Sequence, residues 1–256
     1  MKIITLLTDF GSKDPYAGIM KGVILSINPD VTIIDITHEV DPQDIKEGAF
    51  LIQEYYRYFQ RGTIHLAIVD PTVGSTRRPV ILSKDGHSFV GPDNGIFTLL
   101  VDRDTESYAI ENRAFMREDI SDTFHGRDIF APVAAHLSLG VKPSMFGGKI
   151  IDLVHLADLF PEIHTDVLFG EIIRFDRFGN AITNISADTL NHFIKEKPFV
   201  ISVGKVEFKS LNTSYYEKDV TCLIGSSGYL EFAYFKGSFK EEQRVWKGDE
   251  VTVRIE

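Results

Sequence analysis

The order of apolar segments between residues 3 and 69 constrains the fold more than any other feature of the sequence. Short runs rich in β-branched residues alternate with longer amphipathic runs, in the order Ile3–Leu7, Tyr16–Leu25, Val31–Ile36, Gln43–Phe59 and Ile64–Val69. The short runs are typical of buried strands, and the longer runs have the apolar spacing of helices. This alternation predicts an α/β domain built on a doubly wound parallel sheet.

Shorter elements follow this alternation. Two strands, Val80–Ser83 and Ser88–Val90, flank the Gly-containing turn Lys84–His87 and predict a β-hairpin. Short helices are expected at Ile96–Val101 and Ile129–Leu139. The start of the second helix could present backbone N–H groups to a ligand.

The chain beyond residue 165 has β character. Six strands are expected there: Asp166–Phe175, Ala181–Ile185, Phe199–Val203, Val220–Ile224, Tyr229–Tyr234 and Glu250–Ile255. Short strands at this spacing are typical of a small barrel or sandwich. Residues 141–165 contain two prolines and a Gly-Gly pair without clear periodicity, which is typical of a domain boundary. We expect an α/β domain over residues 1–160 and a smaller β domain over residues 166–256.

The composition excludes several classes of protein. The 256 residues carry a formal net charge of −10, whereas nucleic-acid partners are usually held by clustered Lys and Arg, so no nucleic-acid partner is expected. No apolar run approaches the roughly 18 residues of a membrane span, and no signal peptide is recognisable. We therefore expect a cytoplasmic protein without a membrane partner. Cys222 is the only cysteine, which excludes an intrachain disulfide.

The strongest candidate site is the turn between Asp70 and Arg77. Asp70 follows the expected buried strand Ile64–Val69, and ligands of open α/β sheets bind outside the carboxyl ends of the strands. Pro71 and Gly74 make the exit irregular, so that Arg77 can fold back toward Asp70. The alternative interpretation is a strand-end acid beside a solvated arginine.

Other candidates lie on loops. Asp9 is a second acid at a strand end, but its Asp-Phe-Gly context lacks the other kinase signatures. A phosphatase that uses an aspartate after the first strand stays conceivable, although Gly11 occupies the position of its usual second acid. His125 precedes Gly126 in a loop that enters a helix and is either functional or a capping residue. Arg127 and Asp128 are more typical of a helix start.

The sequence predicts neither a metal site nor a common cofactor motif. It has no P-loop, no GxGxxG after the first strand and no HExxH, and its eight histidines are not clustered. Asp93-Asn94-Gly95 is most typical of a turn. The polar turn around Phe178 and Asn180 could place an aromatic face beside an amide, the groups that recognise a heteroaromatic base.

Six motifs together give the chain a resemblance that no single motif carries. They are Thr8–Gly11, Val69–Gly74 with Arg77, Gly91–Gly95, His125–Pro132, Phe178–Asn184 and Ser226–Leu230. In this order the chain resembles the S-adenosylmethionine hydroxide adenosyltransferase family, the adenosine-forming hydrolases related to the fluorinase and chlorinase. The resemblance implies an α/β domain followed by a β-barrel. It also implies a homotrimer that holds S-adenosylmethionine between one subunit's first domain and its neighbour's second, without a cofactor.

The resemblance also implies roles for individual residues. Asp70, Arg77 and His125 match the set that activates water for attack on the ribose 5′ carbon. The substrate-binding positions are Asp9 for the ribose hydroxyls, Phe178 and Asn180 for adenine, Asp176 and Ser226 for the methionine end, and Asn94 in its turn.

Two departures and two alternatives accompany the resemblance. Thr72 stands where the family usually has glycine, and residues 231–239 lack the usual Asn-Asn-Gly-Ser-Ala. The fluorinase pattern lacks the acid and histidine that Asp70 and His125 provide, so the chain resembles the hydrolase branch. A chlorinase-like halogenase and a non-catalytic nucleoside-binding sensor are the alternatives.

Overall fold

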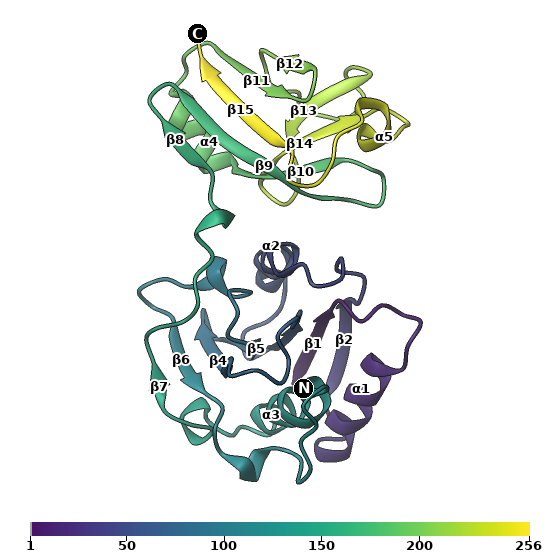
Figure 1. Ribbon diagram of the computed structural model, residues 1–256, viewed down its shortest axis with the longest axis vertical. Coiled ribbons are helices and arrows are strands. Elements are labelled where there is room, and N and C mark those ends of the chain that lie inside the picture. The colour runs from purple at the N-terminus through teal and green to yellow at the C-terminus, as the bar shows by residue number, and fades with distance from the viewer. Residues whose placement is uncertain (1) are drawn as a thin grey trace. The chain divides into compact units, whose positions relative to one another are not determined.

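The computed structural model describes residues 2–256 and divides into two compact units (Figure 1). The first unit ends at Leu156, and the second runs from Ala157 to Glu256. Residue 1, where the first expected domain begins, lies outside the described residues. The division falls inside the segment 141–165, in which the prolines and glycines interrupt regular structure.

The first unit is built on one seven-stranded mixed sheet in the order β2-β1-β3-β5-β4-β6-β7. Its strands are β1 Ile3–Thr8, β2 Thr32–Thr37, β3 Ile64–Ile68, β4 Pro79–Lys84, β5 His87–Pro92, β6 Glu106–Ala109 and β7 Lys149–Ile150. The first four strands in this order are parallel neighbours, which confirms the expected α/β sheet. The last three continue it in antiparallel fashion.

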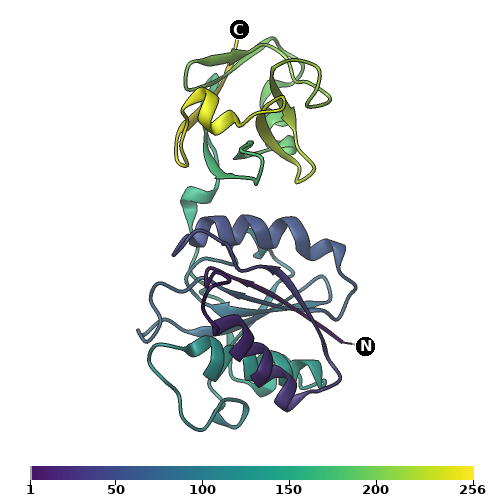
Figure 2. The same cartoon turned by 90° about the vertical axis from the view of Figure 1, so that its right-hand side faces the viewer.

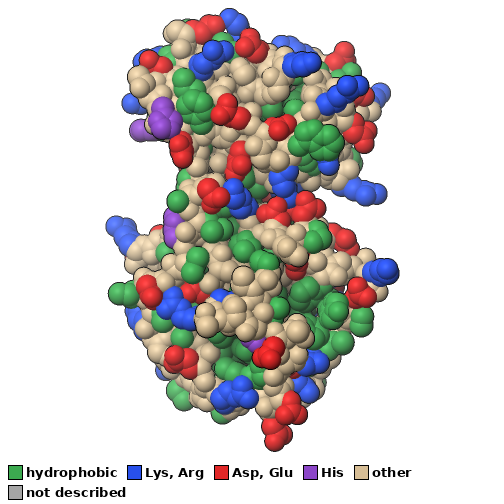
Figure 3. Space-filling view, viewed as in Figure 1, with side chains coloured by type: hydrophobic (Ala, Val, Ile, Leu, Met, Phe, Trp, Pro, Cys, Tyr) green, Lys and Arg blue, Asp and Glu red, His purple; other side chains and the backbone are tan. Residues whose placement is uncertain are grey.

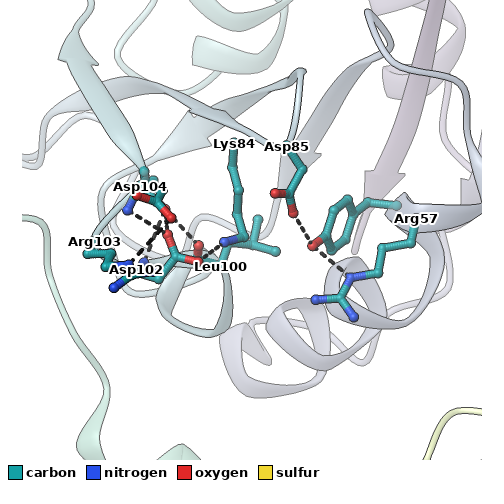
Figure 4. Close-up of polar contacts among 9 residues, drawn as sticks. Arg57, Lys84, Asp85, Leu100, Asp102, Arg103 and Asp104 are labelled. Atoms are coloured by element: carbon teal, nitrogen blue, oxygen red, sulfur yellow. Dashed lines mark hydrogen bonds and ion pairs between the residues drawn. The ribbon is translucent and has the colours of Figure 1, made fainter.

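The hairpin of β4 and β5 explains why the sheet is mixed. The two strands are joined by Asp85 and Gly86, whose φ angles of 52° and 82° match the twist of a tight hairpin. Such a turn forces antiparallel pairing. Figure 4 shows how polar contacts anchor this turn: Lys84 pairs with Asp102, and Asp85 accepts a 3.0 Å hydrogen bond from the Tyr56 hydroxyl.

Helices cover both faces of this sheet (Figure 2). Helices α1 (Tyr16–Ile27) and α3 (Ala131–Ser138) pack on one face, whereas α2 (Ile45–Tyr55) packs on the other. Neighbouring residues of β1 point to opposite faces, so Leu6 packs with α1 and Leu7 with α2. This doubly wound arrangement leaves the carboxyl ends of β1 and β3 next to each other at one edge.

The expected helices are present with altered ends. Helix α2 begins after its N-cap Asp44, which accepts a 2.8 Å hydrogen bond from the Glu47 N–H, and it continues into the 3₁₀ turn η1 (Tyr56–Tyr58). The helix expected at Ile96–Val101 is the 3₁₀ turn η2 (Thr98–Leu100). A π-helical turn, η4 (Gly126–Phe130), precedes α3. The other 3₁₀ turns are η3 Arg113–Phe115, η5 Pro143–Met145 and η6 Ala157–Leu159.

The second unit is a barrel-like antiparallel sheet in the order β12-β11-β15-β9-β10-β14-β13, with β8 on β9. Its strands are β8 Glu162–His164, β9 Val167–Phe175, β10 Ala181–Ser186, β11 Phe199–Val203, β12 Val206–Phe208, β13 Val220–Ile224, β14 Tyr229–Tyr234 and β15 Glu250–Ile255. They enclose a single apolar core that includes Leu168, Ile201 and Phe232. All six expected strands are present, and the barrel is confirmed. Helices α4 (Ala187–Ile194) and α5 (Phe239–Gln243) were not expected.

The distribution of surface charge and the length of the helices are relevant to the expectations of no nucleic-acid partner and no membrane span. Figure 3 shows acidic and basic side chains interspersed on the visible face of each unit, so the net charge of −10 is not gathered there in one block. Within residues 2–256, every helix is too short or too polar to cross a lipid bilayer.

Candidate active site

Asp70 and Arg77 form a buried ion pair at the carboxyl end of β3. The Arg77 Nε lies 3.0 Å from each Asp70 carboxylate oxygen, and its Nη2 makes a second contact with Oδ2. The side chains are only 5% and 7% exposed for Asp70 and Arg77, so this is not a solvated strand end. The fork-like contact fixes the guanidinium in one orientation.

The turn between these residues depends on Gly74. Its φ of 79° lies in the left-handed region, and a Cβ there would come within 2.4 Å of the Asp122 carbonyl oxygen. Thr72 is exposed, and its carbonyl oxygen accepts a 3.1 Å hydrogen bond from Ser75 N–H. The turn therefore closes and returns Arg77 to Asp70 with threonine in place of the family's glycine.

His125 completes the group from a different part of the chain. It precedes the π-helical turn η4, and its Nδ1 lies 2.7 Å from Arg77 Nη2. Arginine can only donate, so Nδ1 is the acceptor and the ring proton resides on Nε2. Burial, followed by the charge of Arg77, lowers the pKa of His125 below its ordinary value of 6.5. His125 is therefore a neutral imidazole at pH 7, able to donate a hydrogen bond from Nε2.

This protonation state is directly measurable. In long-range ¹H–¹⁵N NMR spectra, His125 is expected to show predominantly the neutral Nε2–H form at pH 7–8, because its lowered pKa delays proton uptake to more acidic solution. A doubly protonated His125 ring at pH 7, or a proton on Nδ1, would contradict the assignment.

Phe130 and Asn94 support the ion pair. The guanidinium carbon of Arg77 lies 5.3 Å from the ring centre of fully buried Phe130, a cation–π distance. Asn94 donates a 2.8 Å hydrogen bond to the Val69 carbonyl and accepts one from Ile96 N–H. The amide nitrogen of Asn94 thus holds the backbone next to Asp70, while its oxygen closes the turn to Ile96, which makes Asn94 a positioning residue in this structure.

Beside the ion pair lies a cavity of about 380 Å³, which we call the first cavity. Asp70 and His125 line it together with three aromatic rings, Phe10, Tyr16 and Phe124. These rings meet edge to face, with centres 5.2–6.1 Å apart. Sequence reasoning missed Tyr16 and Phe124, because the α1 start and the loop before η4 meet only in the folded unit.

Asp9 lies at the neighbouring strand end. Thr8 of β1 pairs with Ile68 of β3, so Asp9 and Asp70 follow adjacent parallel strands. The Asp9 Oδ2 accepts a 2.9 Å hydrogen bond from the Gln43 N–H. Its ribose role stays a prediction.

The second unit contains a separate cavity of about 660 Å³, which we call the second cavity. Four residues singled out from the sequence line it: Asp176, Phe178, Asn180 and Ser226. Asp176 accepts hydrogen bonds from the Phe178 and Asn180 N–H groups and from the Asn180 side chain, each at 2.9 Å. This closed turn leaves the Phe178 ring 75% exposed at the cavity.

Tyr215 and Glu231 were missed by sequence reasoning. Tyr215 lines the second cavity and donates a 3.0 Å hydrogen bond to the buried Glu231 carboxylate. Burial and the Glu231 charge raise the pKa of Tyr215 to about 12. Phe235 and Lys236, from the atypical segment 231–239, also line this cavity. The departure from the family pattern therefore lies at the cavity wall.

Three acidic groups lie close together at the start of α2. Within residues 2–256, ligand atoms of Asp41, Asp44 and Glu47 come within 4.8 Å of one another. Asp44 already caps α2, Glu47 is buried, and only Asp41 of the three is exposed.

The chain folds into an α/β unit and a following barrel. The first unit carries a buried acid–arginine–histidine group, and the barrel carries an aromatic-lined cavity. The SAM hydroxide adenosyltransferase N-terminal domain matches residues 4–147, and the C-terminal domain of the same family matches residues 170–252. The chain therefore belongs to the SAM hydroxide adenosyltransferase family.

Individual relatives agree with this membership. The (R)-S-adenosyl-L-methionine hydrolase of Thermus thermophilus is 35% identical, with 97% of this chain and 98% of the relative covered. The fluorinase of Nocardia brasiliensis is 31% identical over 72% of this chain and 71% of its own. The crystal structure of an uncharacterized conserved protein from Thermotoga maritima has a TM-score of 0.88 at 34% identity, covering 98% of this chain and 99% of its own.

Proposed function

We propose that this protein hydrolyses S-adenosyl-L-methionine to adenosine and L-methionine. The oxygen of water bonds to the ribose 5′ carbon, the bond from that carbon to sulfur breaks, and its electron pair neutralises the sulfonium. One proton is released. The observation that carries the proposal is the buried Asp70–Arg77–His125 group beside the first cavity, in a chain of this family.

The chemistry suits these residues because the sulfonium is already a good leaving group. The enzyme must hold a water oxygen opposite sulfur and favour its hydroxide character. Arg77 supplies a fixed positive charge for the developing hydroxide, and Asp70 holds the guanidinium in place. The Nε2–H of His125 orients the water by donating to it. Neither a metal nor an organic cofactor is required.

The second cavity supplies the recognition of the substrate in this proposal. Phe178 offers its exposed ring to adenine, and Asn180 offers the amide beside it. Asp176 and Ser226 hold the methionine end. Asp9 binds the ribose hydroxyls at the edge of the first unit.

The relatives' name specifies the R configuration at sulfur, and we extend this preference to the present chain. Incubation of the purified protein with each sulfur epimer, followed by mass spectrometry, tests both points. We expect adenosine and methionine in equal amounts, formed faster from the R epimer.

A halogenated adenosine formed in the presence of chloride would instead indicate a halogenase. Tight adenosine binding without any turnover would indicate a sensor.

Replacing Phe178 with alanine tests the adenine contact. Loss of an aromatic contact of about 0.5–1.5 kcal/mol is expected to raise KM roughly 2- to 13-fold, with kcat nearly unchanged. Tyr58→Ala, which removes an exposed aromatic side chain (80%) that lines neither cavity, is the control. An unchanged KM in Phe178→Ala would remove Phe178 from the substrate site.

We also propose that the protein is a homotrimer with substrate sites shared by neighbouring copies, as the family resemblance implies. Light scattering after size exclusion is expected to give three times the chain mass of 28.8 kDa. A mass of 28.8 kDa at working concentration, together with full activity, would contradict shared sites.

A further inference from the structure

A hydrogen-bonded chain ends at Thr8, the last residue of β1. The fully buried Thr8 Oγ1 lies 2.8 Å from His38 Nδ1. The other ring nitrogen of His38, Nε2, lies 3.1 Å from Asp35 Oδ1. Lys21 Nζ contacts the second Asp35 oxygen at 2.6 Å. We call Thr8, His38 and Asp35 the Thr8 relay.

The direction of each hydrogen bond in the Thr8 relay follows from its ends. Lys21 and His38 hold the Asp35 pKa below 3.8 despite partial burial, so Asp35 is an acceptor and His38 Nε2 must carry a proton. At the other end, the Phe10 N–H donates to Thr8 Oγ1 at 3.3 Å. With neutral His38, the Thr8 hydroxyl donates to Nδ1 and completes a chain in which every group has a partner.

The Thr8 relay has the residue types of a hydrolase triad but not the accessibility. The Thr8 side chain is 0% exposed, and its oxygen already accepts the Phe10 N–H. A nucleophile needs room for an electrophilic carbon next to its oxygen. The relay therefore acts on the backbone that follows Thr8.

That backbone forms the edge of the first cavity. Phe10, held by Thr8, lines the cavity, and Asp9 lies between the two. Two further hydrogen bonds join the same segments: Gly11 N–H donates to the His38 carbonyl at 2.7 Å, and Val40 N–H to the Thr8 carbonyl at 3.4 Å. The loop after β2 thus fixes the exit of β1.

We propose that His38 is a positioning residue for substrate binding, acting through the Thr8 hydroxyl to hold the Asp9–Phe10 segment, of which Phe10 lines the first cavity. The identity of the substrate rests on the proposed function. Removing the relay leaves the Asp70–Arg77–His125 group in place, so binding weakens while the chemical step continues.

Thr8→Val and His38→Ala test this role. Each is expected to raise KM for S-adenosyl-L-methionine about tenfold with kcat within about twofold of wild type, since one buried hydrogen bond is lost. The double variant is expected to be no worse than either single variant, because both remove the same link. Thr8→Ser retains the hydroxyl and should restore KM. His164→Ala, which removes an exposed histidine paired with Glu162, is the control and should leave KM unchanged.

Calorimetric titration with adenosine separates this inference from the proposed function. If wild type binds adenosine and Thr8→Val weakens that binding about tenfold, the positioning role stands even without turnover. Wild-type hydrolysis with unchanged KM and adenosine affinity in Thr8→Val and His38→Ala would overturn the role and leave the proposed function intact. A lowered melting temperature with unchanged KM would likewise reduce the relay to a scaffold.

Discussion

Replacing Arg77 with lysine is expected to lower kcat/KM for S-adenosyl-L-methionine by about 10²- to 10³-fold in a folded protein. Lysine keeps the charge but loses the planar fork that contacts both Asp70 oxygens and His125 at once. Loss of one preorganised donor in a buried site typically costs about this factor. Steady-state kinetics measure the effect, and circular dichroism verifies folding.

The neighbouring arginine is a matched control for Arg77. Arg78 pairs with Asp93 and Asp152, whereas Arg77 contacts Asp70 and His125, the two residues of the group that line the first cavity. Arg78→Lys is expected to leave kcat/KM within about threefold of wild type. Asp70→Asn combined with Arg77→Lys should be little worse than Arg77→Lys alone, because the pair acts as one unit. Near-wild-type activity in Arg77→Lys would refute the assignment.

Replacing Asp128 with alanine is expected to destabilise the first unit by about 1–3 kcal/mol, the usual cost of leaving a donor without its acceptor. The Asp128 carboxylate is fully buried and accepts hydrogen bonds from Arg127 and from the Ser121 N–H. Arg117 Nε lies 3.2 Å away. The substitution leaves the Ser121 N–H without its acceptor, whereas the Arg127 and Arg117 side chains, 34% and 49% exposed, can be solvated by water. Urea unfolding measures the change, and amide exchange at Ser121 reports the local loss.

The pH dependence provides a second test of Asp128. Burial opposes ionisation, but Arg127 and the Ser121 N–H outweigh it and hold the Asp128 pKa below its ordinary value of 3.8. The contribution of the Asp128 carboxylate to the free energy of unfolding is therefore complete above pH 3.8 and is lost as pH falls through the pKa of Asp128 in the folded state. The difference between wild type and Asp128→Ala should shrink in the same range. Asp188→Ala, an exposed first-turn acid of α4, should change stability by less than about 0.5 kcal/mol. An equal effect of both substitutions would contradict the account.

The sequence was sufficient to predict the layers of the fold and to place Asp9 and Asp70 at the strand ends of the first unit. Short apolar runs such as Ile64–Val69 are typical of strands that are buried on both faces of a parallel sheet. Acids that follow such strands lie at the same edge of the sheet, where ligands bind. Asp9 and Asp70 are placed by this rule alone. His125 needed the family resemblance, because nothing near residue 125 in the sequence identifies its contact with Arg77.

Other parts of the site depend on contacts between distant segments. Tyr215 reaches Glu231 across the second unit, and Phe124 reaches Tyr16 across the first. Neither pair has a periodic or spacing signal. Helices α4 and α5, which were not expected, did have a sequence signal in their N-cap serines. Ser238 precedes α5 and accepts the Glu241 N–H three residues on, and Ser186 caps α4 by accepting the Thr189 N–H. Short helices with few apolar positions are easily mistaken for loops.

Hydrolysis in ¹⁸O-labelled water tests the central claim most directly. Attack of water on the ribose 5′ carbon predicts one ¹⁸O atom in adenosine and none in methionine, read by mass spectrometry of both products. Arg77→Lys should slow the appearance of labelled adenosine without changing where the label goes. Label in methionine, or unlabelled adenosine released at the wild-type rate, would contradict the assignment of Asp70, Arg77 and His125 to water activation at that carbon.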